Sequence, residues 1–308
     1  MDSLSDVLAQ FRVSSTVFSR AELRAPWAVH TSGLNRGIFH AVVRGRGWLA
    51  LEGAQEQAVP FSTGDVVVLP HGHAHVMSSD PALPPVPITE LIETGDSNVD
   101  VLRVDGGGMR TELVCGSIEF AHATGHPLLS QLPHFMHVRA EDATLGGWLS
   151  EIVRLLSEEV THDRPGASTL TARLADVVVV QALRAYIASL PPGEGGWLGA
   201  LNDPDIRRAL ALLHSHPQET WTTKTLAHKV GMSRSSLYAR FSALVGDPPG
   251  RYLTRWRIHL AARALREEKL TVGEAALRVG YESEASFSKA FKTLLGQSPG
   301  AWRKAANY

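Results

Sequence analysis

The chain has 308 residues, of which 44% are hydrophobic and 20% charged, so a mostly disordered chain is excluded and about two globular domains are expected. Its single cysteine excludes an internal disulfide framework. The first residues show neither the basic nor the apolar region of a signal peptide, and aliphatic runs such as 177–180 are far shorter than the ~20 residues of a membrane span. We therefore expect a cytoplasmic protein without membrane segments.

The net charge of −1 is divided unevenly along the chain. Residues 201–308 hold 17 Lys and Arg against 9 Asp and Glu, a net charge of +8, whereas residues 1–200 carry a net charge of −9. All six lysines lie between residues 224 and 304. A basic module attached to an acidic one indicates either a polyanionic partner for the C-terminal part or a basic domain that packs on its acidic neighbour.

The N-terminal part of the sequence predicts short β-strands. Between residues 36 and 80, apolar and polar residues alternate in runs that glycine-containing turns separate, and strand signals continue at 99–104 and 111–120. Short strands at this spacing are typical of a β-sandwich or β-barrel. We assign this domain to residues 1–140. Its strands are predicted at residues 38–43, 47–51, 65–69, 99–104 and 111–120.

Helical periodicity begins near residue 141. It predicts a helix at 145–160 and a second helix that Ser168 caps. The second helix packs an apolar stripe either on the β domain or, together with the first helix, on a second copy of the chain. We assign 141–190 to a helical dimerisation segment and the Pro- and Gly-rich stretch 191–201 to an interdomain linker. The stripe consists of Leu170, Leu174, Val177, Val178, Ala182, Ala185 and Tyr186.

Residues 202–308 have the pattern of an all-α domain. Asp203 caps a helix that begins at Pro204, and Thr222 or Thr223 caps a short helix that ends at Val230. The remaining helices are predicted at 234–244 after Ser233, at 249–268, after Thr271 with Glu274 in a capping box, at 284–295 after Ser283, and from Pro299.

This domain contains an internal repeat of helix, glycine turn and serine-capped helix. Val230, Gly231 and Ser233 lie at the turn of the first copy, and Val279, Gly280 and Ser283 recur 49 or 50 residues later. A short glycine-containing turn between two helices is the pattern of a helix-turn-helix motif. The alternative is a plain helical bundle with a chance repeat, which the two capped copies and the positive charge disfavour.

The repeat predicts double-stranded promoter DNA as a partner. A serine cap leaves the first N–H groups of its helix beside side chains that can contact base edges. The helix between the copies, at 251–268, is a rod of roughly 27 Å that can hold two recognition helices about one DNA turn (~34 Å) apart. The side chains predicted to contact DNA are Arg234, Ser235, Ser236, Tyr238, Arg240, Glu284, Ala285, Ser288, Lys289 and Lys292.

Residues 203–306 resemble the DNA-binding domain of AraC/XylS-type transcription regulators. The resemblance implies a seven-helix unit whose two recognition helices enter adjacent segments of the major groove. The sequence departs from the family pattern at Ala239, Ala275 and Lys289, and a lysine cannot bind guanine through a planar fork. The matching residues are Leu226-Ala227, Val230-Gly231-Met232-Ser233, Leu237, Phe241, Val279-Gly280-Tyr281, 287–292, Gly296, Ser298-Pro299 and Trp302-Arg303.

Residues 36–120 resemble the cupin-like sensor half of a subset of these regulators. This resemblance implies a small barrel that holds an effector, a metal or neither. It rests on a shorter set of residues: Phe39-His40, 64–70, Ala74-His75 and Val114-Cys115-Gly116.

Several histidines of this half suggest a zinc site. His71, His73 and His75 alternate, so on an extended strand they share one face. His40, His73 and His75 together with Cys115 form the candidate set of nitrogen and sulfur ligands, which zinc prefers. The metal-cupin pattern also has a glutamate shortly after His-x-His, and this sequence lacks it. The alternative is a set of hydrogen-bonded structural histidines, with Cys115 either buried and inert or a redox-sensing thiol.

These features predict an α+β multidomain protein with a cupin-like β-barrel, a helical pair, and an all-α domain with two helix-turn-helix motifs. We expect a sequence-specific transcription regulator rather than an enzyme. Its N-terminal domain is expected to sense a small molecule, a metal or a redox signal, and a homodimer is expected. RNA polymerase is a further candidate partner. The alternative function is a metal-dependent cupin enzyme with a helical appendage.

Overall fold

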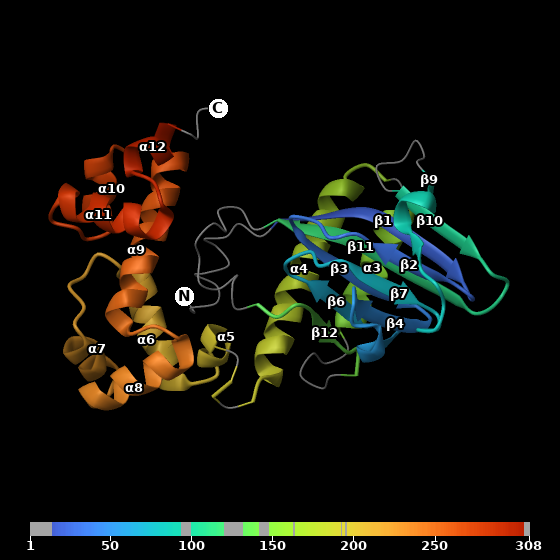
Figure 1. Ribbon diagram of the computed structural model, residues 1–308, viewed down its shortest axis with the longest axis horizontal. Helices are drawn as coiled ribbons and strands as arrows, with labels where there is room; N and C mark the ends of the chain where they lie inside the picture. The colour runs from blue at the N-terminus through green and yellow to red at the C-terminus, as the bar shows by residue number, and fades with distance from the viewer. Residues whose placement is uncertain are drawn as a thin grey trace. The chain divides into compact units, whose positions relative to one another are not determined.

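The computed structural model describes residues 14–93, 100–119, 132–141, 148–162, 164–191, 193–194 and 196–304. These residues divide into two compact units (Figure 1). The β-rich unit takes in the described residues up to 119 and those at 132–189, and the helical unit takes in those from 190 onwards. No helix among the described residues is long and apolar enough to cross a membrane.

Two sheets form the β-rich unit. The larger sheet has the strand order β12-β6-β3-β11-β1-β10-β9, and the smaller has the order β5-β4-β7-β2-β8. The strands of the larger sheet are β1 (Ser14–Arg24), β3 (Gly37–Arg44), β6 (Val66–Leu69), β9 (Ile92–Glu93), β10 (Asp100–Asp105), β11 (Arg110–Glu119) and β12 (Met136–Val138). Those of the smaller sheet are β2 (Ala28–Thr31), β4 (Arg46–Leu51), β5 (Val59–Ser62), β7 (His75–Ser78) and β8 (Val86–Pro87).

The two sheets pack face to face around one apolar core. Leu23, Val42 and Leu113 of the larger sheet share this core with Leu49 and Met77 of the smaller one. The described strands therefore form an open two-sheet cupin-like fold, whereas the sequence suggested a barrel. Strands β3 and β6 are buried on both faces, because helices cover the side of the larger sheet that points away from the smaller sheet. This is why their sequences read as continuous apolar runs.

The covering helices are α3 (Trp148–Thr161) and α4 (Ala167–Ser189). Helix α4 packs on β1, β6 and β12, and α3 packs on β3 and on α4 (Figure 1). Helix α4 begins at Ala167, so the predicted cap Ser168 lies inside the helix. The residue directly before the helix, Gly166, has a φ of 87°, in the left-handed region. Residues 145–147, where the first helix was expected to begin, lie outside the described residues.

The predicted apolar stripe of α4 is divided between two faces. Val178, Ala182 and Ala185 are buried, whereas Leu170 and Val177 are exposed. The Asp176 carboxylate accepts a hydrogen bond from the backbone N–H of Ser15 at 2.8 Å and so connects α4 to β1. One part of the stripe therefore packs on the β-rich unit, as one of the two predicted alternatives requires.

The helical unit follows the predicted order closely. Its helices are α5 (Gly196–Ala200), α6 (Pro204–Ser215), α7 (Thr223–Val230), α8 (Arg234–Val245), α9 (Pro249–Glu267), α10 (Val272–Arg278), α11 (Glu284–Leu295) and α12 (Pro299–Lys304). The caps are those expected: the side chains of Asp203, Thr222, Ser233, Thr271 and Ser283 each accept hydrogen bonds from first-turn N–H groups of their helices.

Helix α5 lies in the stretch 191–201 that composition predicts as a linker. Trp197 of α5 is fully buried, and its indole N–H donates a hydrogen bond to the Tyr252 hydroxyl at 2.8 Å. The Tyr252 hydroxyl also hydrogen-bonds Nε2 of His214 at 2.7 Å. A five-residue helix is too short to show periodicity, so the surrounding prolines and glycines dominate the sequence pattern.

Candidate functional site

The first helix-turn-helix motif consists of α7 and α8. Gly231 ends α7 in the left-handed region at φ 77°, which glycine adopts without a steric cost. Ser233 then caps α8, and Leu237 and Phe241 bury one side of that helix completely. The opposite side of α8 therefore faces solvent. The predicted DNA contacts on this side, all exposed, are Arg234, Ser235, Ser236 and Tyr238.

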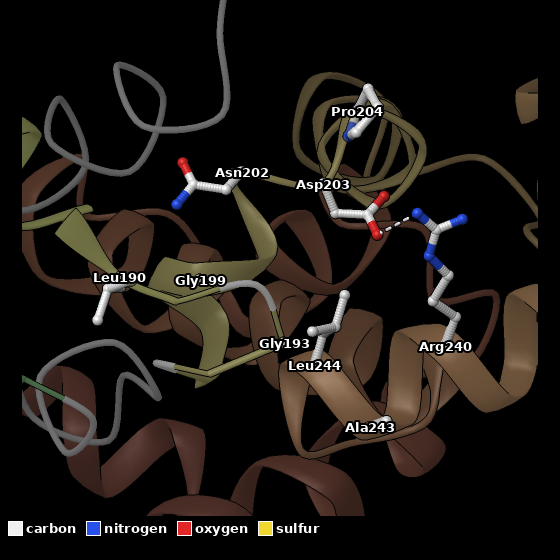
Figure 2. A pocket seen from close by; sticks show the side chains of 9 residues that line it. All are labelled: Leu190, Gly193, Gly199, Asn202, Asp203, Pro204, Arg240, Ala243 and Leu244. Carbon is white, nitrogen blue, oxygen red and sulfur yellow. Dashed lines mark ion pairs between the residues drawn. The ribbon is translucent and has the colours of Figure 1, made fainter. Parts of the chain in front are cut away.

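Arg240, the fifth predicted contact of this helix, is held by two carboxylates. Its guanidinium lies 2.6 Å from Oδ2 of Asp203 and 3.3 Å from Oδ2 of Asp205. Figure 2 shows the Asp203–Arg240 pair at the side of a surface pocket of about 670 Å³. Asp203 is also the N-cap of α6, so the ion pair braces α8 against the start of α6. Sequence reasoning missed this pairing, because the residues lie far apart in the chain.

The second motif consists of α10 and α11. Ser283 caps α11, and Phe287 and Phe291 are fully buried beneath it. The side chains of Glu284, Lys289 and Lys292 form no ion pair within the described part of the chain. Of the predicted contacts on this helix, Ser288 is half-buried, and Glu284, Ala285, Lys289 and Lys292 are exposed.

The arginines of α9 brace the helical unit from within. Asp247, which lies just before α9, pairs with Arg251 at 3.2 Å and with Arg255 at 2.7 Å. The Arg266 guanidinium lies over the ring of Trp302, 3.7 Å from its centroid, where a cation–π attraction operates. Arg257 donates hydrogen bonds to backbone carbonyls. Arg251, Arg255, Arg257 and Arg266 therefore all have partners within the helical unit.

In the β-rich unit, a buried cluster contains three of the four candidate metal ligands. Cys115 lies directly opposite His40 in the β3–β11 pairing, and the Cys115 sulfur is 3.0 Å from Nδ1 of His40. Nε2 of His40 is 2.9 Å from Nε2 of His75, and Nδ1 of His75 is 2.9 Å from the carbonyl oxygen of His73. All three side chains are buried.

The carbonyl of His73 fixes the direction of this hydrogen-bond chain. A carbonyl only accepts, so Nδ1 of His75 carries a proton and Nε2 of neutral His75 is an acceptor. His40 then donates from Nε2, and the Cys115 thiol donates to Nδ1 of His40. Burial lowers the pKa of both histidines and raises the pKa of Cys115 to about 12, which favours these neutral forms.

This arrangement does not fit a metal ion bound by the four predicted ligands. Cys115 and His75 contact opposite nitrogens of the His40 ring, so the three side chains do not converge on one point. His73 lies apart from them, with its Nε2 3.2 Å from Nδ1 of His134. Among the residues that the structure describes, no group of three or more His, Cys, Asp or Glu side chains has the arrangement of a metal site.

The shared face that an extended strand would give His71, His73 and His75 is not formed. Strand β7 begins only at His75, and the residues before it form a turn. Gly72 adopts φ 66°, and a Cβ there would lie 2.1 Å from the carbonyl oxygen of Arg36. His75 therefore joins the buried cluster from the start of β7, whereas His71 and His73 lie together before that strand, with ring centroids 5.5 Å apart.

A small, mainly apolar cavity lies between the sheets beside the buried cluster. Its volume is about 30 Å³, which is room for one or two water molecules. His40 and Cys115 of the cluster are among the residues that line it. Its apolar wall includes Phe18, Trp27, Met77 and Leu113.

Comparison with known proteins supports both units. A family model described as cupin matches residues 2–188, and one described as a helix-turn-helix domain matches residues 226–305. An AraC-like transcription regulator of Streptomyces lividans is 37% identical over 305 residues, which cover 99% of this chain and 98% of that protein. The regulator AlkR of Acinetobacter baylyi is 29% identical over 313 residues, 99% of each chain.

Some solved structures are similar to part of the chain. The DNA-binding domain of AdpA, in complex with a target DNA, is 34% identical, covering 32% of this chain and 87% of that domain, with a TM-score of 0.31. The sequence relatives and family models define a cupin joined to a DNA-binding helix-turn-helix domain. The chain belongs to the AraC-like family of transcription regulators. It is therefore a DNA-binding regulator rather than the metal-dependent cupin enzyme that was the alternative.

Proposed function

We propose that this regulator reads promoter DNA with the exposed N-terminal parts of α8 and α11. The observation that carries the proposal is that both helices are serine-capped and leave basic or polar side chains exposed on the side opposite their buried residues. The net charge of +8 in residues 201–308 favours a polyanion. We assign the contacts to the predicted residues of these helices, with Arg240 acting as a brace.

Selection from a pool of random DNA duplexes by the full chain tests this proposal. We expect enrichment of a duplex with two contacted segments, and we expect its affinity to fall steeply as salt rises, because Lys and Arg displace counterions from phosphates. Failure to enrich any duplex, or an affinity that does not depend on salt, would overturn the proposal.

We assign the sensing role of the β-rich unit to a small molecule that enters between the sheets. The buried thiol, with its raised pKa, lacks the thiolate character that a redox sensor needs, and the ligand geometry argues against a metal. The cavity is small, so a ligand has to displace side chains. Met77, an unbranched and flexible residue, is suited to move.

The affinity for the selected duplex, measured with added small apolar compounds, Zn²⁺ or peroxide, tests this assignment. We expect one of the apolar compounds to change the affinity, and we expect Met77→Phe, which fills the cavity, to abolish that response without changing basal DNA binding. A response to Zn²⁺ or peroxide alone would contradict it.

We further assign a homodimer to the exposed faces of α3 and α4. Trp148 and Leu155 lie seven residues apart on α3, and Leu170 and Val177 lie seven residues apart on α4, so each pair occupies one helix face. All four side chains are more than a third exposed. A second copy would cover these apolar residues through a symmetric interface. Sedimentation equilibrium should show a dimer that the double substitution Leu170→Glu, Val177→Glu converts to a monomer, and an unchanged mass would contradict the assignment.

RNA polymerase is a further proposed partner, because the chain belongs to a family of transcription regulators.

A further inference from the structure

One guanidinium on α9 connects segments of the two helix-turn-helix motifs. Nε of Arg257 donates a hydrogen bond to the carbonyl oxygen of Pro217 at 2.6 Å, and its Nη2 donates to that of Glu219 at 2.8 Å. Its Nη1 donates to the carbonyl oxygen of Gly280 at 3.4 Å. Pro217 and Glu219 precede α7 of the first motif, and Gly280 forms the turn of the second motif. Arg257 therefore bonds backbone atoms of the loop that leads into the first motif and of the turn of the second.

The same two segments touch each other closely. Gly280 adopts φ 83°, and a Cβ at this position would lie 2.4 Å from the carbonyl oxygen of Gln218 and 2.7 Å from its Cα. Such distances leave no room for any side chain. The turn of the second motif is therefore fitted against the loop that leads into the first. In the first motif the equivalent Gly231 has no neighbouring atom within 4 Å of its Cβ position.

The chemistry of the contact explains why an arginine occupies this position. Its planar fork carries five N–H donors in fixed directions, so one side chain can bond three carbonyl oxygens of two segments. A lysine has one nitrogen and cannot match this pattern. The guanidinium is half-buried, and desolvation lowers its pKa, which remains that of a charged group at neutral pH. Its charge strengthens each of these hydrogen bonds.

We propose that Arg257 is a positioning residue that fixes the second helix-turn-helix motif relative to the first, so that α8 and α11 bind the same DNA molecule in register. This inference rests on the proposed role of both helices in DNA binding. Each helix also packs on α9, and Arg257 and Gly280 add a direct connection between the loop before the first motif and the turn of the second.

Arg257→Lys in the full chain tests the proposal, with Arg263→Lys as the matched control on the same helix. The probes are the duplex selected from the random pool and two versions in which one contacted segment is replaced. We expect Arg257→Lys to bind the complete duplex at least about 10-fold more weakly, since tenfold corresponds to ~1.4 kcal/mol. Binding to the one-segment duplexes should stay within about twofold, and Arg263→Lys should match the wild type on all three.

The loss of affinity on each duplex distinguishes a positioning role of Arg257 from other roles. An equal loss on complete and one-segment duplexes would mean a phosphate contact or a damaged fold, and no loss on any would also overturn the proposal. Gly280→Ala provides a second variant, which should reproduce the selective loss by a different physical route, because its Cβ would meet the Gln218 backbone.

A distance measurement in the absence of DNA tests the positioning role separately from DNA binding. Spin labels at Ala243→Cys on α8 and Thr293→Cys on α11 report the distance distribution between the two helices, while buried Cys115 stays unlabelled. We expect a narrow distribution in the otherwise unchanged chain and a broad one with Arg257→Lys. Equal widths would overturn the positioning role. Failure of the wild type to select any duplex would overturn the proposed function instead.

Discussion

The two helix-turn-helix motifs share a sequence pattern, but they are held in place differently. The first motif is braced through its recognition helix, where Arg240 pairs with Asp203 and Asp205, and its turn glycine is unobstructed. The second is held at its turn, where Gly280 meets Gln218 and Arg257. The two copies therefore share the capped helix and its buried face, whereas different contacts orient each copy.

The two recognition helices also present different chemistry. Helix α8 exposes Arg234 and Tyr238, and α11 exposes Glu284 and Lys289. Arginine binds guanine through two hydrogen bonds, glutamate accepts a hydrogen bond from cytosine, and lysine acts as a point charge. We therefore expect the two copies to prefer different base sequences, so a binding site without internal symmetry follows for a single chain.

The largest effect is expected from removing a buried ring of either motif. Phe241→Ala and Phe287→Ala each empty a fully buried position and should lower the free energy of unfolding by about 3–5 kcal/mol. Urea denaturation measures this loss. If only one of the two variants is destabilised, the two motifs do not depend on equivalent buried faces, which would contradict the similarity described above.

Substitution of one basic residue in each recognition helix should distinguish their roles. We expect Arg234→Ala to weaken DNA binding by about 1–3 kcal/mol and to relax preference at one base position. Lys289→Ala should weaken binding to all sequences alike and reduce the salt slope by about 1. Titration of matched and mismatched duplexes at several salt concentrations measures both. Loss of base preference with Lys289→Ala would reverse this assignment.

The two capping serines, Ser233 and Ser283, should contribute modestly different amounts to the free energy of unfolding. The N–H of Ser236 lies 3.1 Å from the Ser233 hydroxyl, whereas the N–H of Ser286 lies 3.4 Å from the Ser283 hydroxyl. Ser233→Ala should cost about 1 kcal/mol of stability, and Ser283→Ala should cost less, because its hydrogen bond is longer. Thermal unfolding compares the two variants, with Ser→Gly at each position as a control that is expected to be mild.

The smallest effect is expected from Arg240→Ala. Its guanidinium is 45% exposed, so solvent screens the pair with Asp203 and the loss of stability should be about 0.5–1 kcal/mol. The salt slope of DNA binding should not change, because this charge is already paired with carboxylates. A slope reduced by about 1 would show instead that Arg240 contacts phosphate.

The helical unit could be predicted well from sequence because its signals are local. The side chains of Thr222, Ser233, Thr271 and Ser283 bond N–H groups within the next three residues, so the same short patterns fix both the cap and the start of its helix. In the β-rich unit the sequence located β3, β4, β6, β10 and β11, but it did not predict β1, β2, β5 or β7.

Long-range geometry limited the prediction of the functional residues. The pairing of β3 with β11 does bring His40 and Cys115 together, but only the structure shows that Cys115 and His75 contact opposite ring nitrogens. The turn at Gly72 depends on backbone carbonyls of a distant segment. Arg240 was predicted to contact DNA and Arg257 counted only toward the positive charge of the domain, and their partners lie between 23 and 40 residues away.

The close fit of Gly280 against Gln218 has a consequence for protein engineering. A 25-residue cassette containing only the second motif would lose both the loop that its turn rests on and the guanidinium that bridges them. Transplanting its DNA preference into another scaffold therefore requires carrying over the loop before α7 and the whole of α9, and the first motif in turn needs the start of α6, where Asp203 and Asp205 hold Arg240.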